Sequence, residues 1–315
     1  MLAIETEGLT KDYQVGFWRP RPYRALHDLT LAVERGDVFG FLGPNGAGKS
    51  TAIKLLMQLI YPTSGTARIL GRPAGDVDMR RRIGFLPENP SFYDYLTAEE
   101  LLTYFAGLFD VPSADRAGRV SRVLDEVGIG GERRMRLRSY SKGMVQRVGI
   151  AQAIINDPDV VFFDEPMSGL DPLGRRDVRQ LLLRLRDRGC TVFFSSHILS
   201  DAEALCSRVA IVAQGRLAGG GRLSDIVGAD VLGWELIADR VGPEALAMLQ
   251  VRARAVTTLH DGRCAVELPP EPPEATVQAL AAAGGRVVSL NPLRHTLEDY
   301  FVQHVAQAAS REATP

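Results

Sequence analysis

The stretch of sequence that decides the fold is GPNGAGKST, residues Gly43–Thr51. It fits the pattern G-x-x-x-x-G-K-[ST], in which glycine-rich backbone wraps phosphate oxygens and a lysine supplies positive charge. Before it, Asp37–Leu42 has the apolar run of a short buried strand, and after it Ala52–Ile60 has the apolar spacing of a helix. The pattern requires a strand, a glycine loop and a helix in this order. The sequence therefore predicts a nucleotide site.

Each part of this loop has an expected role. Lys49 is placed to contact the β- and γ-phosphates, and the Ser50 hydroxyl is placed to ligate Mg²⁺. The alternative is a glycine-rich turn with a surface lysine, which does not account for the strand and the helix beside it. The residues predicted to form the phosphate site are Gly43, Pro44, Asn45, Gly46, Ala47, Gly48, Lys49, Ser50 and Thr51.

The composition bounds the class of protein. With 315 residues, 45% of them hydrophobic, the chain is long enough for a full-sized domain and a smaller one. Its 37 basic and 38 acidic residues give no bulk electrostatic argument for binding nucleic acid or an anionic membrane. The widely spaced Cys190, Cys206 and Cys264 indicate buried, reduced thiols rather than a zinc cluster or a disulfide framework.

The sequence shows neither an export signal nor a membrane span. Its first residues, MLAIETEG, lack a basic leader and an apolar segment, so we expect the cytoplasm. No uninterrupted apolar stretch approaches the roughly 18 residues that cross a bilayer. Any role at a membrane is therefore expected to need a partner.

Two further buried strands are predicted to end in reactive side chains. Val160–Phe163 is followed by Asp164 and Glu165, at the edge where parallel α/β sheets bind ligands. An Asp there can hold Mg²⁺ and an adjacent Glu can deprotonate water, whereas the alternative is two solvated acids in a turn. Thr191–Phe194 leads to His197, which can reach a γ-phosphate. A serine hydrolase would need the turn G-x-S-x-G, which is absent.

Several helix starts and one aromatic residue have open interpretations. Tyr13 stacks on adenine or is a half-buried tyrosine of a hairpin formed by Ala3–Thr10 and Ala25–Val33. Thr97 followed by Glu100 forms a capping box. Ser141 is placed as the N-cap of a helix that runs to Ile155, which makes a second anion-binding helix start, although most serine caps bind nothing.

Two segments offer no chemistry of their own. Between the helix predicted over Ser113–Val127 and Tyr140, four arginines at positions 133, 134, 136 and 138 are typical of a solvated face. Beyond residue 228 the pattern alternates between short strands and helices, which predicts a small α+β domain. It has no phosphate loop, metal-ligand spacing or acid pair, so we interpret it as a binding or regulatory module.

In this order, the motifs resemble those of the ATP-binding subunit of ATP-binding cassette (ABC) transporters whose membrane-spanning subunit is a separate chain. The resemblance covers about residues 1–225 and rests on GPNGAGKST at 43–51, VVFFDEP at 160–166, SGLDP at 168–172, SSH at 195–197 and YSKGMVQR at 140–147. It implies an α/β, P-loop ABC ATPase domain with a mixed sheet core and a helical subdomain at about 88–158. Residues 228–315 resemble only faintly the C-terminal extensions of exporter-type subunits.

The resemblance implies an Mg²⁺-dependent ATPase that powers transport, and we expect export. Two such domains would form a homodimer head to tail, with each ATP between one phosphate loop and the partner's signature helix. The expected partner is a transmembrane permease at the cytoplasmic face of the cell membrane, and no nucleic acid is expected. The alternative is a soluble ABC-type ATPase acting on nucleic acid or in translation. Such relatives tend to carry two ATPase domains or long coiled coils, which this chain lacks.

The resemblance also assigns roles to individual residues. Tyr13 would stack on adenine, Glu165 would polarise water and His197 would contact the γ-phosphate. The remaining implied contacts are Ser141 and Gly143 to the opposite ATP, Asp171 across the dimer, and Ser50, Asp164 and Glu88 to Mg²⁺.

Three positions depart from the family pattern. Lys142 and Met144 differ from the usual signature LSGGQ, and Glu88 stands where the family has a glutamine. A carboxylate can ligate Mg²⁺ but, when it is ionised, it cannot donate a hydrogen bond. Glu88 and the helices beside it, at about 88–140, are the expected contact with the membrane subunit.

Overall fold

The computed structural model describes residues 1–312 except residues 17, 229–230 and 260–261. The chain divides into two compact units, the first comprising Met1–Leu223 with the residues from Phe301 on, and the second comprising Ser224–Tyr300. The predicted boundary between 225 and 228 lies close to this division. The assignment of the last residues differs from the prediction of one domain over 228–315, because a helical period does not reveal the surface on which a helix packs.

A six-stranded sheet forms the centre of the first unit, in the order β10-β9-β3-β8-β7-β6. Strands β9, β3, β8, β7 and β6 are parallel and β10 is an antiparallel edge, so the predicted mixed sheet is confirmed. The strands span Val38–Leu42 (β3), Ile83–Leu86 (β6), Val160–Asp164 (β7), Thr191–Ser196 (β8), Arg208–Ala213 (β9) and Arg216–Arg222 (β10). Phe193 lies at the middle of this sheet, 5.3–5.6 Å from the ring centroids of Phe39, Phe41 and Phe162.

A second sheet, of order β2-β1-β4-β5, packs its apolar residues into the same core. Its strands are β1 (Leu2–Val15), β2 (Arg21–Glu34), β4 (Ser64–Ile69) and β5 (Arg72–Pro73). The predicted strands Ala3–Thr10 and Ala25–Val33 were too short, because polar and aromatic residues at the hairpin end hide the strand period. Cross-strand hydrogen bonding extends the ribbon so far that Tyr13 lies directly opposite Tyr23.

Helix α1 spans Lys49–Leu56, whereas the sequence predicts Ala52–Ile60. The apolar period misses the polar first turn, which starts directly after the glycine loop. At the other end, Gln58 takes a left-handed conformation with φ of 50°, which stops the helix. Both errors have local causes, and the strand, loop and helix order is confirmed.

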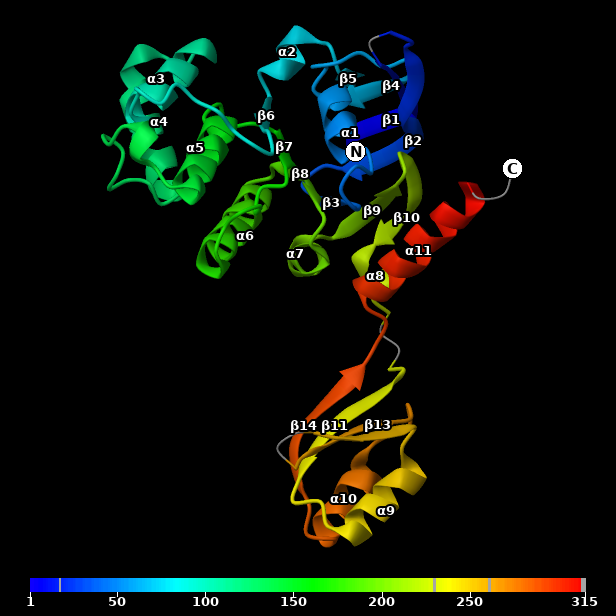
Figure 1. Ribbon diagram of the computed structural model, residues 1–315. Coiled ribbons are helices and arrows are strands. Elements are labelled where there is room, and N and C mark those ends of the chain that lie inside the picture. The colour runs from blue at the N-terminus through cyan, green and yellow to red at the C-terminus, as the bar shows by residue number, and fades with distance from the viewer. Residues whose placement is uncertain (17, 229–230, 260–261, 313–315) are drawn as a thin grey trace. The chain divides into compact units, whose positions relative to one another are not determined.

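Helices α3 (Ala98–Leu108), α4 (Ser113–Glu126) and α5 (Lys142–Ile154) form a separate group at one side of this unit (Figure 1). The predicted capping box is confirmed, since Thr97 Oγ1 accepts a hydrogen bond from the Glu100 amide and the Glu100 carboxylate accepts one from the Thr97 amide. A short 3₁₀ turn, Leu137–Ser139, precedes α5. Helix α2 (Val77–Arg80) precedes β6.

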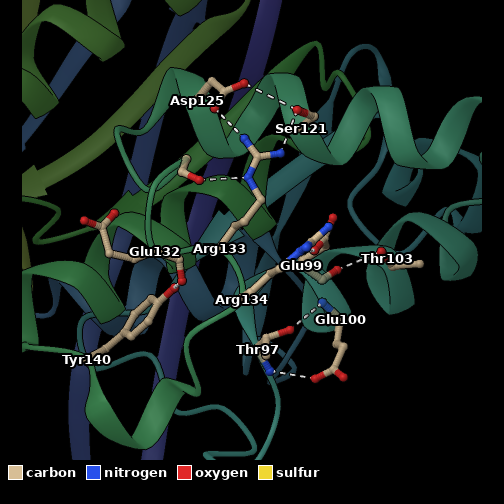
Figure 2. Close-up of polar contacts among 11 residues, drawn as sticks. Thr97, Glu99, Glu100, Thr103, Ser121, Asp125, Glu132, Arg133, Arg134 and Tyr140 are labelled. Atoms are coloured by element: carbon tan, nitrogen blue, oxygen red, sulfur yellow. Dashed lines mark hydrogen bonds and ion pairs between the residues drawn. The ribbon is translucent and has the colours of Figure 1, made fainter.

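Polar contacts hold the arginine-rich segment before α5 onto α3 and α4 (Figure 2). Arg133 contacts Asp125 at 2.7 Å and the Ser121 hydroxyl at 2.8 Å, both on α4. Arg134 reaches Glu99 of α3 at 3.4 Å. The predicted solvated face is wrong for Arg133, because the i, i+4 pair of acceptors on α4 pulls its side chain inward. The segment that leads to Ser141 is therefore fixed to its own subdomain.

Two helices follow strands of the central sheet, α6 (Pro172–Asp187) after β7 and α7 (Leu199–Leu205) after β8. Cys190 and Cys206 are buried without a disulfide, as predicted, and burial raises the pKa of the Cys190 thiol to about 12. Within the described residues, no helix has both the length and the apolar character that a membrane span requires.

The second unit has the order βαββαβ, with an antiparallel sheet β12-β13-β11-β14 and two helices packed on it (Figure 1). Its elements are β11 (Gly233–Asp239), α9 (Pro243–Arg252), β12 (Ala255–Thr258), β13 (Cys264–Leu268), α10 (Glu274–Ala282) and β14 (Arg286–Leu293). A short helix, α8 (Leu223–Ile226), precedes β11, and α11 (Leu297–Glu312) follows β14.

Candidate nucleotide site

The glycine loop between β3 and α1 is shaped by backbone that other residues adopt poorly. Gly46 and Gly48 have φ of 78° and 98°, in the left-handed region. A side chain at Gly43 would come within 2.3 Å of the Val212 carbonyl oxygen. Helix α1 has no side-chain cap at its N-terminus. The first amides of a helix have no acceptor within it, so this start offers donors to an anion.

Three reactive side chains meet beside this helix start. The Lys49 ammonium lies 2.7 Å from the Gly43 carbonyl oxygen and 3.2 Å from Glu165 Oε1. His197 Nδ1 lies 2.8 Å from Glu165 Oε2. Lys49 and Glu165 are only 6% and 7% exposed, whereas the imidazole is half-exposed. The carboxylate thus bridges a buried cation and a histidine, although the three residues are far apart in the sequence.

Sheet order explains why these residues meet. Strand β8 lies between β3 and β7, and all three are parallel. Their carboxyl ends therefore lie at one edge and deliver the glycine loop, the acids and His197 to the same place. Asp164 is the last residue of β7 and is buried, and its Oδ1 accepts a hydrogen bond of 2.6 Å from the Ser195 hydroxyl.

A pocket of about 540 Å³ opens over the helix start, within the range of roughly 300–1,000 Å³ that small-molecule sites occupy. Its predicted lining residues are Tyr13, Asn45, Gly46, Ala47, Gly48, Lys49, Ser50, Thr51, Glu88, Glu165 and His197. It is also lined by Tyr23, Ala25 and Ser168, which the sequence analysis did not select. Helix amides, a lysine and a serine hydroxyl at one end are the donors that a polyphosphate needs.

Two tyrosines of the pocket lining are opposite each other on neighbouring strands. Tyr13 on β1 pairs with Tyr23 on β2, and both line the pocket. The Lys11 ammonium lies 5.3 Å from the centroid of the Tyr13 ring, a cation–π distance. Tyr13 is therefore a half-buried strand residue as well as a pocket residue, so the two interpretations of its position are compatible.

The residues expected at the opposite ATP lie elsewhere. Ser141 caps α5 by accepting a hydrogen bond from the Met144 amide at 3.3 Å, which confirms the predicted N-cap. Gly143 packs toward Leu170, and Asp171 caps α6 by accepting one from the Gly174 amide at 2.7 Å. None of the three lines the pocket over α1. Within one copy of the described chain they therefore form no common site with Lys49.

Besides Ala25 and Ser168, three residues of the site region escaped the sequence analysis. The position of Tyr23 in the pocket could not be predicted, because it depends on the register of a hairpin. Ser195 is part of the SSH motif, but only the structure reveals that its hydroxyl contacts Asp164 and the Glu165 amide. Gln146 is part of YSKGMVQR, and its amide donates to the Pro166 carbonyl oxygen at 3.0 Å. Its place in YSKGMVQR was the signal available in the sequence, whereas its burial is known only from the structure.

A glycine loop at an uncapped helix start, with a lysine and two strand-end acids, defines a P-loop nucleotide-binding ATPase. Known proteins agree. Residues 26–168 match the family model described as ABC transporter. The uncharacterized ABC transporter ATP-binding protein sll0415 of Synechocystis is 43% identical over 307 residues, covering 97% of this chain and 85% of that protein.

Two further similarities concern a transporter subunit and a solved structure. The fluoroquinolones export ATP-binding protein MT2762 of Mycobacterium tuberculosis is 39% identical over 195 residues, covering 61% of this chain and 64% of that protein. A dimeric post-hydrolysis state of the ATP-binding cassette MJ0796, bound to ADP and Pi, superposes with a TM-score of 0.64 at 26% identity. That match covers 70% of this chain and 98% of that one.

The chain belongs to the family of ABC transporter ATP-binding proteins. The predicted family and fold class are thus confirmed, and the chain is an ABC-type ATPase that binds and hydrolyses ATP. None of these similarities points to the alternative function on nucleic acid or in translation.

Proposed function

We propose that this chain powers export across a membrane by hydrolysing ATP in a dimer bound to a separate transmembrane permease. The observation that carries the proposal is the Glu165 carboxylate between Lys49 and His197, at 3.2 and 2.8 Å, beside the phosphate pocket. The name of the M. tuberculosis relative includes export, which supports the direction. The cytoplasmic face of the membrane is the corresponding location.

In this proposal the pocket binds ATP along its length. Tyr13 stacks on the adenine, and the loop Gly43–Thr51 surrounds the phosphates. When phosphate oxygens bind the Lys49 ammonium, they would replace the Glu165 carboxylate in its ion pair with Lys49. The freed carboxylate would then accept a proton from the attacking water. His197, which contacts the same carboxylate, is placed to meet the γ-phosphate.

The residues expected to hold Mg²⁺ fit a metal that keeps phosphate and water ligands. Among the described residues, no group of three or more His, Cys, Asp and Glu side chains is arranged for a metal ion. Mg²⁺ bound to a nucleotide usually takes only one or two protein ligands. Ser50 on α1 and Asp164 on β7 would supply them, with Glu88 at the pocket wall. The ion would neutralise charge on the phosphates.

The dimer completes the site. Ser141, Gly143 and Asp171 lie on helix starts outside the pocket, and a second copy in head-to-tail orientation would bring them to the partner's ATP. The solved structure of the related cassette MJ0796 is dimeric, which supports a dimer. Because Asp171 Oδ1 caps α6, its second oxygen is the one available across the dimer.

The substitution Glu165→Gln tests the catalytic assignment. It keeps the size of the side chain but removes the base, so we expect ATP affinity to stay within threefold and turnover to fall about 100-fold or more. An ATP-bound dimer should accumulate, which size-exclusion chromatography with light scattering detects. Wild-type phosphate release from this variant would remove Glu165 from the catalytic role.

The same variant tests the partner. Tagged Glu165→Gln protein is incubated with detergent-solubilised membranes with and without ATP, and the proteins retained are identified. A stoichiometric polytopic membrane protein is expected. The Lys49→Ala variant, which should bind ATP much more weakly, serves as the control for ATP-dependent recovery. Recovery of ribosomes or nucleic acid instead would contradict the transport role.

A further inference from the structure

The backbone of Glu165 has a conformation that needs support. Its φ is 51°, in the left-handed region that residues other than glycine, asparagine and aspartate rarely adopt. Such strain persists only where the surrounding structure holds it, and it is common at functional sites. The residue is also buried, so its peptide groups need hydrogen-bond partners from the protein rather than from water.

Ser195 supports this conformation from β8. Its side chain is fully buried, and its hydroxyl oxygen accepts a hydrogen bond of 2.9 Å from the Glu165 amide. The same hydroxyl donates to Asp164 Oδ1 at 2.6 Å. One side chain therefore fixes both acids, although it does not line the nucleotide pocket.

Gln146, on α5, supports the backbone one residue after Glu165. It is 3% exposed, and its Nε2 donates to the Pro166 carbonyl oxygen at 3.0 Å. Around this bond, α5 packs closely on the loop that follows Glu165. Gly143 lies against Leu170, and a side chain at Gly169 would come within 2.8 Å of Lys142 Cε.

We propose that Ser195 and Gln146 are positioning residues that hold the backbone before and after Glu165, through the Glu165 amide and the Pro166 carbonyl, so that its carboxylate stays between Lys49 and His197. This inference rests on the proposed role of Glu165 as the base. Without either side chain, a buried peptide group loses its partner and the left-handed turn relaxes. The carboxylate then leaves the place from which it activates water. Neither residue lines the nucleotide pocket, so binding is expected to be preserved.

The experiment compares Ser195→Ala and Gln146→Leu with the wild type and with the exposed controls Ser200→Ala and Gln180→Leu. We expect each test variant to lose about tenfold in kcat with KM for ATP within twofold, and each control to match the wild type. Thermal unfolding of every variant shows whether it is folded, and Gln146→Leu keeps the test open if Ser195→Ala does not fold.

Double variants separate positioning from general damage. In the Glu165→Gln background, measured in single-turnover reactions, Gln146→Leu and Ser195→Ala should each change the residual rate by less than twofold, because the carboxylate they position is gone. A full tenfold loss in that background would overturn the inference. So would a tenfold rise in the Mg²⁺ concentration needed by Ser195→Ala, since Ser195 would then act through Asp164 alone.

Failure of the inference differs from failure of the proposed function. Wild-type kcat in Ser195→Ala and Gln146→Leu, with an inactive Glu165→Gln, would reject the positioning role and leave the base assignment intact. Wild-type turnover in Glu165→Gln would reject the base assignment itself.

Discussion

Helices α1 and α5 begin in opposite ways. Helix α1 follows glycines, has Gly48 in a left-handed conformation and has no side-chain cap. Helix α5 begins at Ser141, whose hydroxyl already accepts an amide of the first turn. The first start lies under a pocket of about 540 Å³ with a buried lysine, whereas Ser141 is exposed and lines no part of that pocket.

The difference indicates how the two starts are used. A helix start that is uncapped and lies in a pocket of the same chain can bind phosphate within one copy of the chain. A helix start that is capped and exposed has fewer free donors and does not line that pocket. It can therefore bind a nucleotide only when another surface supplies the rest of the site. Helix α1 is therefore expected to determine affinity for ATP, and α5 to determine what the bound ATP does.

The largest expected effect is at α1. Lys49→Ala removes a charge-assisted contact to phosphate worth about 1.5–3 kcal/mol, so ATP affinity should fall about 10- to 100-fold. Titration with a fluorescent ATP analogue measures the change. Lys54→Ala, on the exposed side of the same helix, is the matched control and should bind normally. Near-normal affinity of Lys49→Ala would remove the distinction between the two helix starts.

The next effect is at α5 and concerns turnover. Ser141→Ala should bind ATP normally but lose about tenfold in turnover and form less ATP-dependent dimer, since a hydroxyl that meets the partner's nucleotide is gone. Loss of the cap alone costs about 1 kcal/mol of stability.

Ser141→Asp separates the cap from the nucleotide contact. Aspartate caps a helix as well as serine does, so stability is preserved, but its charge repels phosphate. We expect a stably folded variant without ATP-dependent dimer, measured by light scattering. Wild-type turnover in Ser141→Asp would mean that the start of α5 does not meet a nucleotide.

A smaller effect is expected at the far end of the α1 pocket. Tyr13→Ala should weaken ATP binding about fivefold, the loss of about 1 kcal/mol of stacking. Tyr23→Ala should weaken it about twofold, because this ring is more exposed, and Tyr23→Phe should bind like the wild type. An effect of Tyr23→Ala equal to that of Lys49→Ala would contradict the dominance of the helix start.

The smallest effect on ATP is expected at α3, whose start is closed by its own capping box. Thr97→Ala should lower the free energy of unfolding by about 1 kcal/mol and leave ATP affinity unchanged. Hydrogen bonds from the Thr97 amide and hydroxyl hold the pKa of Glu100 below its usual value. This contribution is therefore present above the ordinary pKa of a glutamate and is lost as the pH falls through the lowered one. Urea unfolding of the wild type and of Thr97→Ala at pH 7 and pH 3 measures the loss of stability and its dependence on pH.

The sequence by itself determined the local parts of this protein. Glycines at fixed spacing and a following lysine specify a phosphate loop, because backbone conformation depends on the nearest residues. The capping box at Thr97 and the N-cap at Ser141 were predictable for the same reason, and both are present. The exact ends of α1 were not predictable, since its polar first turn carries no apolar period.

Only the tertiary structure decided which distant residues meet. The order of β3, β8 and β7 brings Lys49, His197 and Glu165 within contact, and the register of β1 on β2 places Tyr23 beside Tyr13. The bonds of Ser195 to the acids and of Gln146 to Pro166 likewise join residues of different elements. The physical reason is that strand order and helix packing are set by burial of the whole core. No local pattern encodes these contacts.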